Sequence, residues 1–71
     1  MILPELYRLC ANQLETDGAT SFLHNDLTFI IFLNSHREYE YDILDGTDSV
    51  DGGINQSYSA QQTVECILED Y

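Results

Sequence analysis

The sequence contains no lysine and only two arginines, whereas aspartate and glutamate together number 13. The formal net charge is therefore −11 at pH 7. A field of this sign repels nucleic acid and anionic membranes and draws the protein towards basic surfaces. The sequence thus excludes direct binding of nucleic acid or membrane, and it predicts a basic protein as the partner.

Cysteines and long apolar segments are also scarce. The two cysteines, Cys10 and Cys66, are too few for a disulfide framework. The chain begins without the basic segment and apolar run of a secretory signal. The apolar segment 27–33 is far too short to span a bilayer. We therefore expect a reduced, cytoplasmic protein.

The residue patterns of enzymes and metal sites are missing as well. The sequence has no Ser-His-Asp order, CxxC, HExxH or glycine-rich phosphate loop. His24 falls near a predicted turn and His36 in a predicted loop, where histidines are usually surface residues. Asp45, Asp48 and Asp51 are spaced by three, whereas a calcium-binding EF-hand loop needs acids at alternate positions and a glutamate at the twelfth. We expect a nonenzymatic protein with no metal and no other cofactor.

The 71 residues are 44% hydrophobic, which predicts one small folded domain over 1–71 rather than disorder. A helix is expected over 3–16, since Pro4 suits a first turn and Gly18 the residue after a helix. Its apolar face repeats at spacings of three and four: Leu3, Leu6, Tyr7, Cys10 and Leu14.

A second helix is expected after Ser59, which forms a capping-box pattern with Gln62. The apolar face of this helix consists of Ala60, Val64, Ile67, Leu68 and Tyr71, with Thr63 beside them. On its other face, Glu65 and Glu69 lie four apart, where like charges weaken a helix by about 0.2–0.5 kcal/mol. A sequence selected only for stability would place lysine there, so the acidic surface is expected to have a function.

Three strands are expected between the helices, at 21–24, 27–33 and 37–44. A two-residue turn is expected at Asn25-Asp26, between the first two strands. The strand 27–33 is apolar on both alternating faces, so one face should lie under the helices and the other should be thinly covered or form an apolar contact patch. Residues 45–57 are rich in Gly, Asp, Ser and Asn and are expected to form a mobile loop. The predicted fold class is α+β, with a helix, a three-stranded antiparallel sheet and a second helix, both helices on one face.

The strand 37–44 alternates strictly, with Tyr39, Tyr41 and Ile43 on the side predicted to face the core. The acidic side chains on the other side are roughly 6.5–7 Å apart, close to the spacing of phosphates along a nucleic-acid strand. We therefore expect phosphate mimicry, with contact charges at Glu38, Glu40, Asp42, Asp45, Asp48, Asp51, Glu65 and Glu69. Whether Leu44, Val50 and Ile54 add an apolar anchor is left open.

A strongly acidic chain of 71 residues, ordered helix, three strands, helix and without catalytic residues, resembles the small phage-encoded anti-CRISPR proteins. More loosely, it is similar to DNA-mimic inhibitors such as uracil-glycosylase inhibitors. The resemblance covers the whole chain in size, charge and element order, and involves no residue motif. It implies a stoichiometric inhibitor, monomeric or homodimeric, that occupies the basic channel of a CRISPR effector. Its location would be the cytoplasm of an infected or prophage-carrying bacterium.

Two other interpretations stay open at this point. The first is an acidic antitoxin or adaptor that neutralises a basic bacterial protein by its charge. The second is a small metal-binding or halophilic housekeeping domain, in which the acidity serves solubility.

Overall fold

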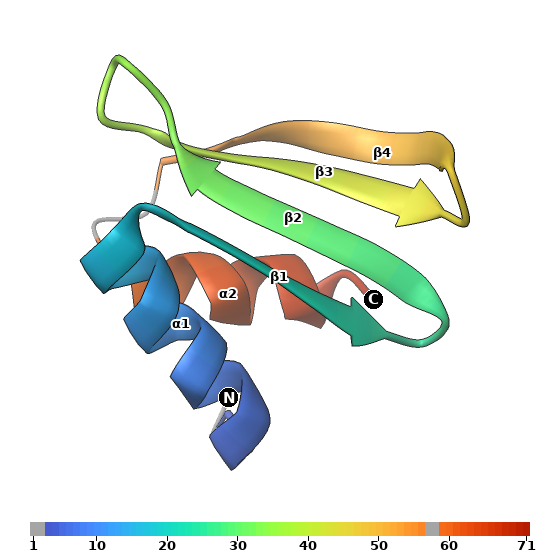
Figure 1. The fold of residues 1–71 in the computed structure, drawn as a ribbon, viewed down its shortest axis with the longest axis horizontal. Helices are drawn as coiled ribbons and strands as arrows, with labels where there is room; N and C mark the ends of the chain where they lie inside the picture. Colours follow the sequence, from blue (N-terminus) through green and yellow to red (C-terminus); the bar gives the residue numbers. More distant parts are fainter. Residues whose placement is uncertain (1–2, 57–58) are drawn as a thin grey trace.

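The structure, a computed structural model, describes residues 3–56 and 59–71. Its elements follow in the order α1 (Glu5–Asp17), β1 (Ala19–His24), β2 (Leu27–Leu33), β3 (Tyr39–Asp45), β4 (Asp48–Asn55) and α2 (Ala60–Glu69). The strands form one antiparallel sheet in the order β1-β2-β3-β4, and both helices lie on the same side of it (Figure 1). The expected α+β class is confirmed, but the sheet has four strands rather than three.

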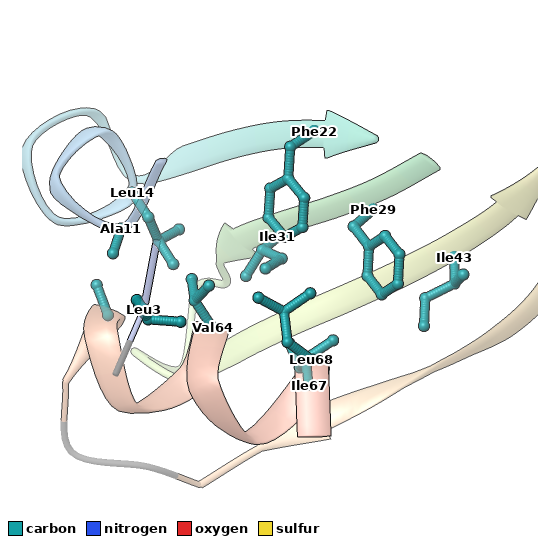
Figure 2. Close-up of a cluster of buried hydrophobic side chains, with 11 residues drawn as sticks. Leu3, Ala11, Leu14, Phe22, Phe29, Ile31, Ile43, Val64, Ile67 and Leu68 are labelled. Carbon is teal, nitrogen blue, oxygen red and sulfur yellow. The ribbon is translucent and has the colours of Figure 1, made fainter. Parts of the chain in front are cut away.

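The hydrophobic core lies between the sheet and the two helices (Figure 2). Phe29 and Ile31 on β2 and Ile43 on β3 have no exposed surface. Helix α1 contributes Ala11 and Leu14, and α2 contributes Ala60, Val64, Ile67 and Leu68. The alternate residues of β2, including Ile30 and Phe32, are only half-buried, which places them on the side away from the helices.

Helix α1 begins after Pro4 and ends at Asp17, and the capping residue Gly18 that follows has a φ of 80°, the left-handed conformation that favours glycine at this position. Its buried face differs from the expected one. Leu6 was expected in the core but is 58% exposed, whereas Ala11 is 3% exposed. Because α1 packs against α2 as well as β1, its buried face is centred nearer Ala11, and Leu6 lies on the flank.

The two-residue turn at Asn25-Asp26 is confirmed. Both residues have positive φ, 51° and 65°, as a type I′ turn requires. Asn and Asp tolerate this left-handed conformation better than other non-glycine residues do. The strand before the turn is longer than expected, since β1 starts at Ala19.

The expectation of a loop over 45–57 was wrong. Residues 48–55 form β4, which pairs with β3 and makes the fourth strand, and position 57 lies outside the described residues. Gly46, with φ of 64°, begins a two-residue turn between the strands. Composition misled here because Gly, Asp and Ser disfavour strands locally, while pairing with β3 overrides that preference.

Helix α2 begins as expected. Ser59 is its N-cap, and the Ser59 Oγ accepts a hydrogen bond from the Gln62 N–H at 3.1 Å. The predicted apolar face is buried at Val64, Ile67 and Leu68. Neither this helix nor α1, in the part of the chain that the structure describes, has the length and apolar character needed to cross a membrane.

Candidate protein-interaction surface

The side of the sheet away from the helices is here called the open face. Strand alternation from the buried residues Phe22, Phe29, Ile31 and Ile43 assigns its members. They are Ala19, Ser21 and Leu23 on β1, Thr28, Ile30 and Phe32 on β2, Glu40, Asp42 and Leu44 on β3, and Ser49, Gly52 and Ile54 on β4. None of these residues is fully buried, so the face is accessible to a partner.

Glu40 lies near the middle of the open face, because β3 is an interior strand. Its cross-strand neighbours are Phe32 on β2 and Ile54 on β4. The Asn34 Nδ2 donates a weak hydrogen bond to the Glu40 Oε1 at 3.4 Å. The carboxylate therefore lies between two large apolar side chains, and the one hydrogen bond that orients it within the described residues is long.

Asp42 is the second carboxylate of the open face, two residues along β3. It lies opposite Ile30 on β2 and Gly52 on β4. The Ser49 Oγ donates a hydrogen bond to the Asp42 Oδ1 at 2.6 Å, which fixes the orientation of the carboxylate. Its second oxygen remains available to a donor from a partner.

A shallow groove runs between β2 and β4 on this face, with walls formed by Phe32 and Ile54. Glu40 and Asp42 line it, and Gly52 leaves backbone as its floor. A Cβ at Gly52 would lie 3.0 Å from the Tyr41 backbone oxygen, so this position has little room for any side chain. Apolar walls beside two carboxylates suit the aliphatic stem and charged head of an arginine or lysine.

Asp51, another predicted contact charge, is on the helix side of β4. The Tyr71 hydroxyl and the Gly52 N–H, the latter at 2.8 Å, donate hydrogen bonds to its carboxylate, and together they lower the pKa of Asp51. The same hydrogen bond raises the pKa of Tyr71 to about 12. The ring of Tyr71 also meets Phe29 edge-on at 5.5 Å, so Asp51 helps to hold the end of α2 on the sheet.

The other predicted contact charges are dispersed. Glu38 lies before β3, which starts at Tyr39 rather than at position 37. Asp45 and Asp48 lie opposite each other beside the β3–β4 turn. Glu65 and Glu69 lie on α2, away from the open face. Of the eight predicted carboxylates, the structure brings only Glu40 and Asp42 together on one groove.

The predicted contact residues did not include Ile30 and Phe32, although one face of their strand was expected to be thinly covered or to form an apolar contact patch. The signal was present, because apolar residues on both alternating faces of β2 had suggested a thinly covered side. Ile54 had been considered as a possible anchor and is 51% exposed beside the groove. No sequence pattern pointed to Gly52, because its role depends on β4 being a strand.

The expected surface position of the histidines holds for His36, which is exposed, but His24 is half-buried. The Tyr7 hydroxyl lies 2.8 Å from the His24 Nδ1, and the two rings meet edge-on. These contacts make His24 part of the packing at one end of the core. Across residues 3–56 and 59–71, no three His, Cys, Asp or Glu side chains are grouped so that they could hold a metal ion.

Comparison of the chain with protein-family models, with curated proteins and with solved structures gives no match.

Proposed function

We propose that this domain is a nonenzymatic inhibitor that binds a basic, nucleic-acid-binding protein through its open face. The observation that carries the proposal is the position of Glu40 and Asp42, two carboxylates on the same side of β3 among apolar side chains, on the sheet face away from both described helices (Figure 1). A partner arginine or lysine would place its charged head on these carboxylates and its stem against Phe32 and Ile54. Such residues otherwise hold nucleic-acid phosphates, so their occupation would block nucleic acid.

The remaining carboxylates have a different role in this proposal. They lie on several sides of the domain, so they cannot all touch one groove of a partner. With a net charge of −11, they contribute a long-range field that steers a basic partner and raises the association rate. Phosphate mimicry by direct contact is thus limited to Glu40 and Asp42, and Glu38, which lies just before β3, is the next candidate.

The target we favour is a CRISPR effector, with the domain acting as a phage anti-CRISPR protein inside a bacterial cell. Size, net charge and the absence of catalytic motifs support this choice, as does a sheet face that combines acidic and apolar groups. A basic channel that holds guide RNA and target DNA is lined by lysine and arginine side chains. Their charged heads suit the two carboxylates of the open face, and their aliphatic stems suit its apolar side chains.

The test is competition between the domain and target DNA for a panel of purified CRISPR effectors of different types. We expect one effector to bind the domain and to lose its DNA, with an affinity that falls steeply between about 50 and 500 mM salt. A panel in which no effector binds would reject the anti-CRISPR form of the proposal. An affinity that does not depend on salt would reject the electrostatic mechanism.

A matched pair of variants tests the site itself. Glu40→Gln with Asp42→Asn removes two charges from the groove, and Glu65→Gln with Glu69→Gln removes two from α2. Each well-formed charged contact contributes about 1.5–3 kcal/mol, and less at an exposed rim. The first double variant should therefore lose at least about tenfold in affinity, roughly 1.4 kcal/mol. The second should lose only about twofold through the weaker field. Equal losses would mean that net charge, and not the open face, is what the partner recognises.

A further inference from the structure

We infer that the domain forms a twofold dimer through the free edge of β1 and the adjoining flank of α1. β1 is an edge strand of the sheet, with α1 beside it (Figure 1). Two features of this side point to the contact: backbone groups of β1 that pair with no other described strand, and the exposed leucines Leu6 and Leu9 on α1. The inference is separate from the proposed function, which uses the β2–β4 part of the open face.

The outer side of β1 offers backbone hydrogen bonds. Residues flanking a two-residue turn form a hydrogen-bonded pair, here His24 and Leu27. Alternate residues back along β1 therefore bond to β2, and the Leu33 N–H donates to the Gly18 carbonyl at 2.8 Å in keeping with this alternation. The N–H and C=O groups that point away from the sheet are those of Ala19, Ser21 and Leu23.

This edge is complementary to itself. If two copies of β1 pair antiparallel about Ser21, each Leu23 lies opposite the Ala19 of the other copy, a large side chain beside a small one. The three outward-pointing residues of each strand then form hydrogen-bonded pairs that exchange two bonds each. The pairing would also cover Leu23, which is 67% exposed.

The flank of α1 below this edge carries two exposed leucines beside the polar residues Gln13, Thr16 and Asp17. The Thr20 Oγ1 donates to the Gln13 Oε1 at 2.8 Å, so the side of α1 that carries Gln13 faces β1. Leu6 and Leu9 lie on that same side by helical spacing, and each is 58% exposed. In the dimer, the two α1 helices would approach beneath the paired β1 strands and cover these leucines.

The lack of charge along β1, together with its self-complementary register, favours a second copy as the occupant. β1 and β2 contain no Asp, Glu, Lys or Arg, so a basic partner would gain no charged contact along the strand itself, and Asp17 is the carboxylate of the adjoining α1 flank. The opposite edge, β4, carries the carboxylates of Asp48 and Asp51. The Gly52 N–H also donates a hydrogen bond to the Asp51 carboxylate, so it is not available to another strand. Both features protect the β4 edge against pairing. Pairing at β1 keeps the acidic strands apart, since β3 and its copy lie five strand spacings, about 24 Å, from each other. That is well beyond the screening length of about 8 Å at physiological salt.

The first measurement is the molecular mass of the whole chain by sedimentation equilibrium between about 1 and 200 µM protein. We expect a rise from 8.1 kDa towards twice that mass, and tighter association at 0.5 M than at 0.05 M salt, because salt screens the repulsion between two acidic chains. Binding of a basic partner should respond to salt in the opposite direction. A mass of one chain at every concentration would overturn the inference.

Two variants locate the contact. Ser21→Pro removes an N–H that points away from the sheet, so it should block pairing while leaving the bonds to β2 intact. Leu9→Gln replaces an exposed leucine of the α1 flank by a polar residue. It serves as the alternative variant if circular dichroism shows that Ser21→Pro is unfolded. Each should raise the dimer dissociation constant at least about tenfold. The control is Ile54→Gln, which changes a similarly exposed apolar residue in the groove. It should leave the dimer dissociation constant unchanged and lower only the affinity for the basic partner. A dimer that withstands both changes would place the contact elsewhere.

Discussion

Replacing Arg37 by glycine should stabilise the fold. Arg37 has a φ of 61°, the left-handed conformation that costs most residues about 1–2 kcal/mol. The hairpin between β2 and β3 requires it: the Arg37 N–H donates to the Asn34 carbonyl at 3.0 Å, and the Asn34 N–H donates to the Glu38 carbonyl at 2.9 Å. A three-residue hairpin loop of this kind usually has glycine at its last position.

The expected gain is the difference between two effects. Glycine removes the strain of about 1–2 kcal/mol, but its greater freedom in the unfolded chain costs about 0.5–1 kcal/mol. The net gain therefore lies between about 0 and 1.5 kcal/mol, with a central value of about 0.75 kcal/mol. For a domain of this size, 1 kcal/mol shifts the melting temperature by about 4–8 °C, so the central value corresponds to an increase of about 3–6 °C.

This prediction can be checked by thermal and urea unfolding of the natural sequence, Arg37→Gly and Arg37→Ala. The control is Arg37→Ala, which removes the same positive charge but keeps a Cβ, and hence keeps the strained conformation. Its stability should stay within about 0.5 kcal/mol of the natural sequence. If the glycine and alanine variants unfold at the same temperature, the left-handed conformation at position 37 carries no cost and the reasoning is wrong.

Two further predictions concern the core and the Asp51–Tyr71 contact. Phe29→Ala should lower the free energy of unfolding, measured in urea, by about 3–5 kcal/mol, because Phe29 is fully buried. Phe32→Ala, on the open face, should lower it much less and should instead reduce the affinity for the partner. Tyr71→Phe should lower the melting temperature between pH 5 and 9, because it removes a hydrogen bond that favours charged Asp51 and neutral Tyr71. That hydrogen bond lowers the pKa of Asp51, so the difference in melting temperature between the natural protein and Tyr71→Phe should vanish as the pH falls below 3.8. The bond also raises the pKa of Tyr71, so the same difference should vanish as the pH rises from 10.0 towards 12. A difference that persists unchanged down to pH 3 would show that Asp51 is not the partner of Tyr71.

Periodicity in the sequence was sufficient where one face of an element is buried. The apolar residues of β2 and the alternation in β3 predicted both strands, and the capping residues Ser59 and Gly18 marked helix boundaries correctly. Leu6 could not be placed, because its exposure depends on how α1 is rotated between α2 and β1. That rotation is determined by tertiary packing, which helical spacing does not specify.

Strand β4 was beyond such reasoning for a physical reason. Nearly all of its residues are exposed, so no buried face imposes an alternating pattern on the sequence. The register between β3 and β4 also shifts at Val50, which pairs with no residue of β3, and this shift disrupts the alternation further. Gly53 fits the strand because the Tyr41 ring lies over it: a Cβ there would meet the Tyr41 hydroxyl oxygen at 3.2 Å. Contact with an aromatic ring on the neighbouring strand compensates for the missing side chain, and that contact is visible only in the structure.

The candidate site was predicted in part for the same reason. Alternation along β3 placed Glu40 and Asp42 together on a solvent-facing side, as the structure has them. Spacing could not reveal that Asp51 is bonded to Tyr71 on the helix side, because those residues are distant in sequence. Nor could it reveal the groove, which requires β4 beside β3.

The division of charge across the sheet connects the two proposed surfaces. The strands β1 and β2 carry no carboxylate, whereas β3 and β4 carry five. Two of these, Asp45 and Asp48, lie directly opposite each other, an arrangement that destabilises a strand pair. A lysine at either position would have relieved the repulsion, so the sequence retains a cost in stability on the acidic half. That cost is understandable if the acidic half must attract a basic partner. The neutral half then leaves the β1 edge as the side of the sheet where two such chains can pair without placing carboxylates of their strands opposite each other.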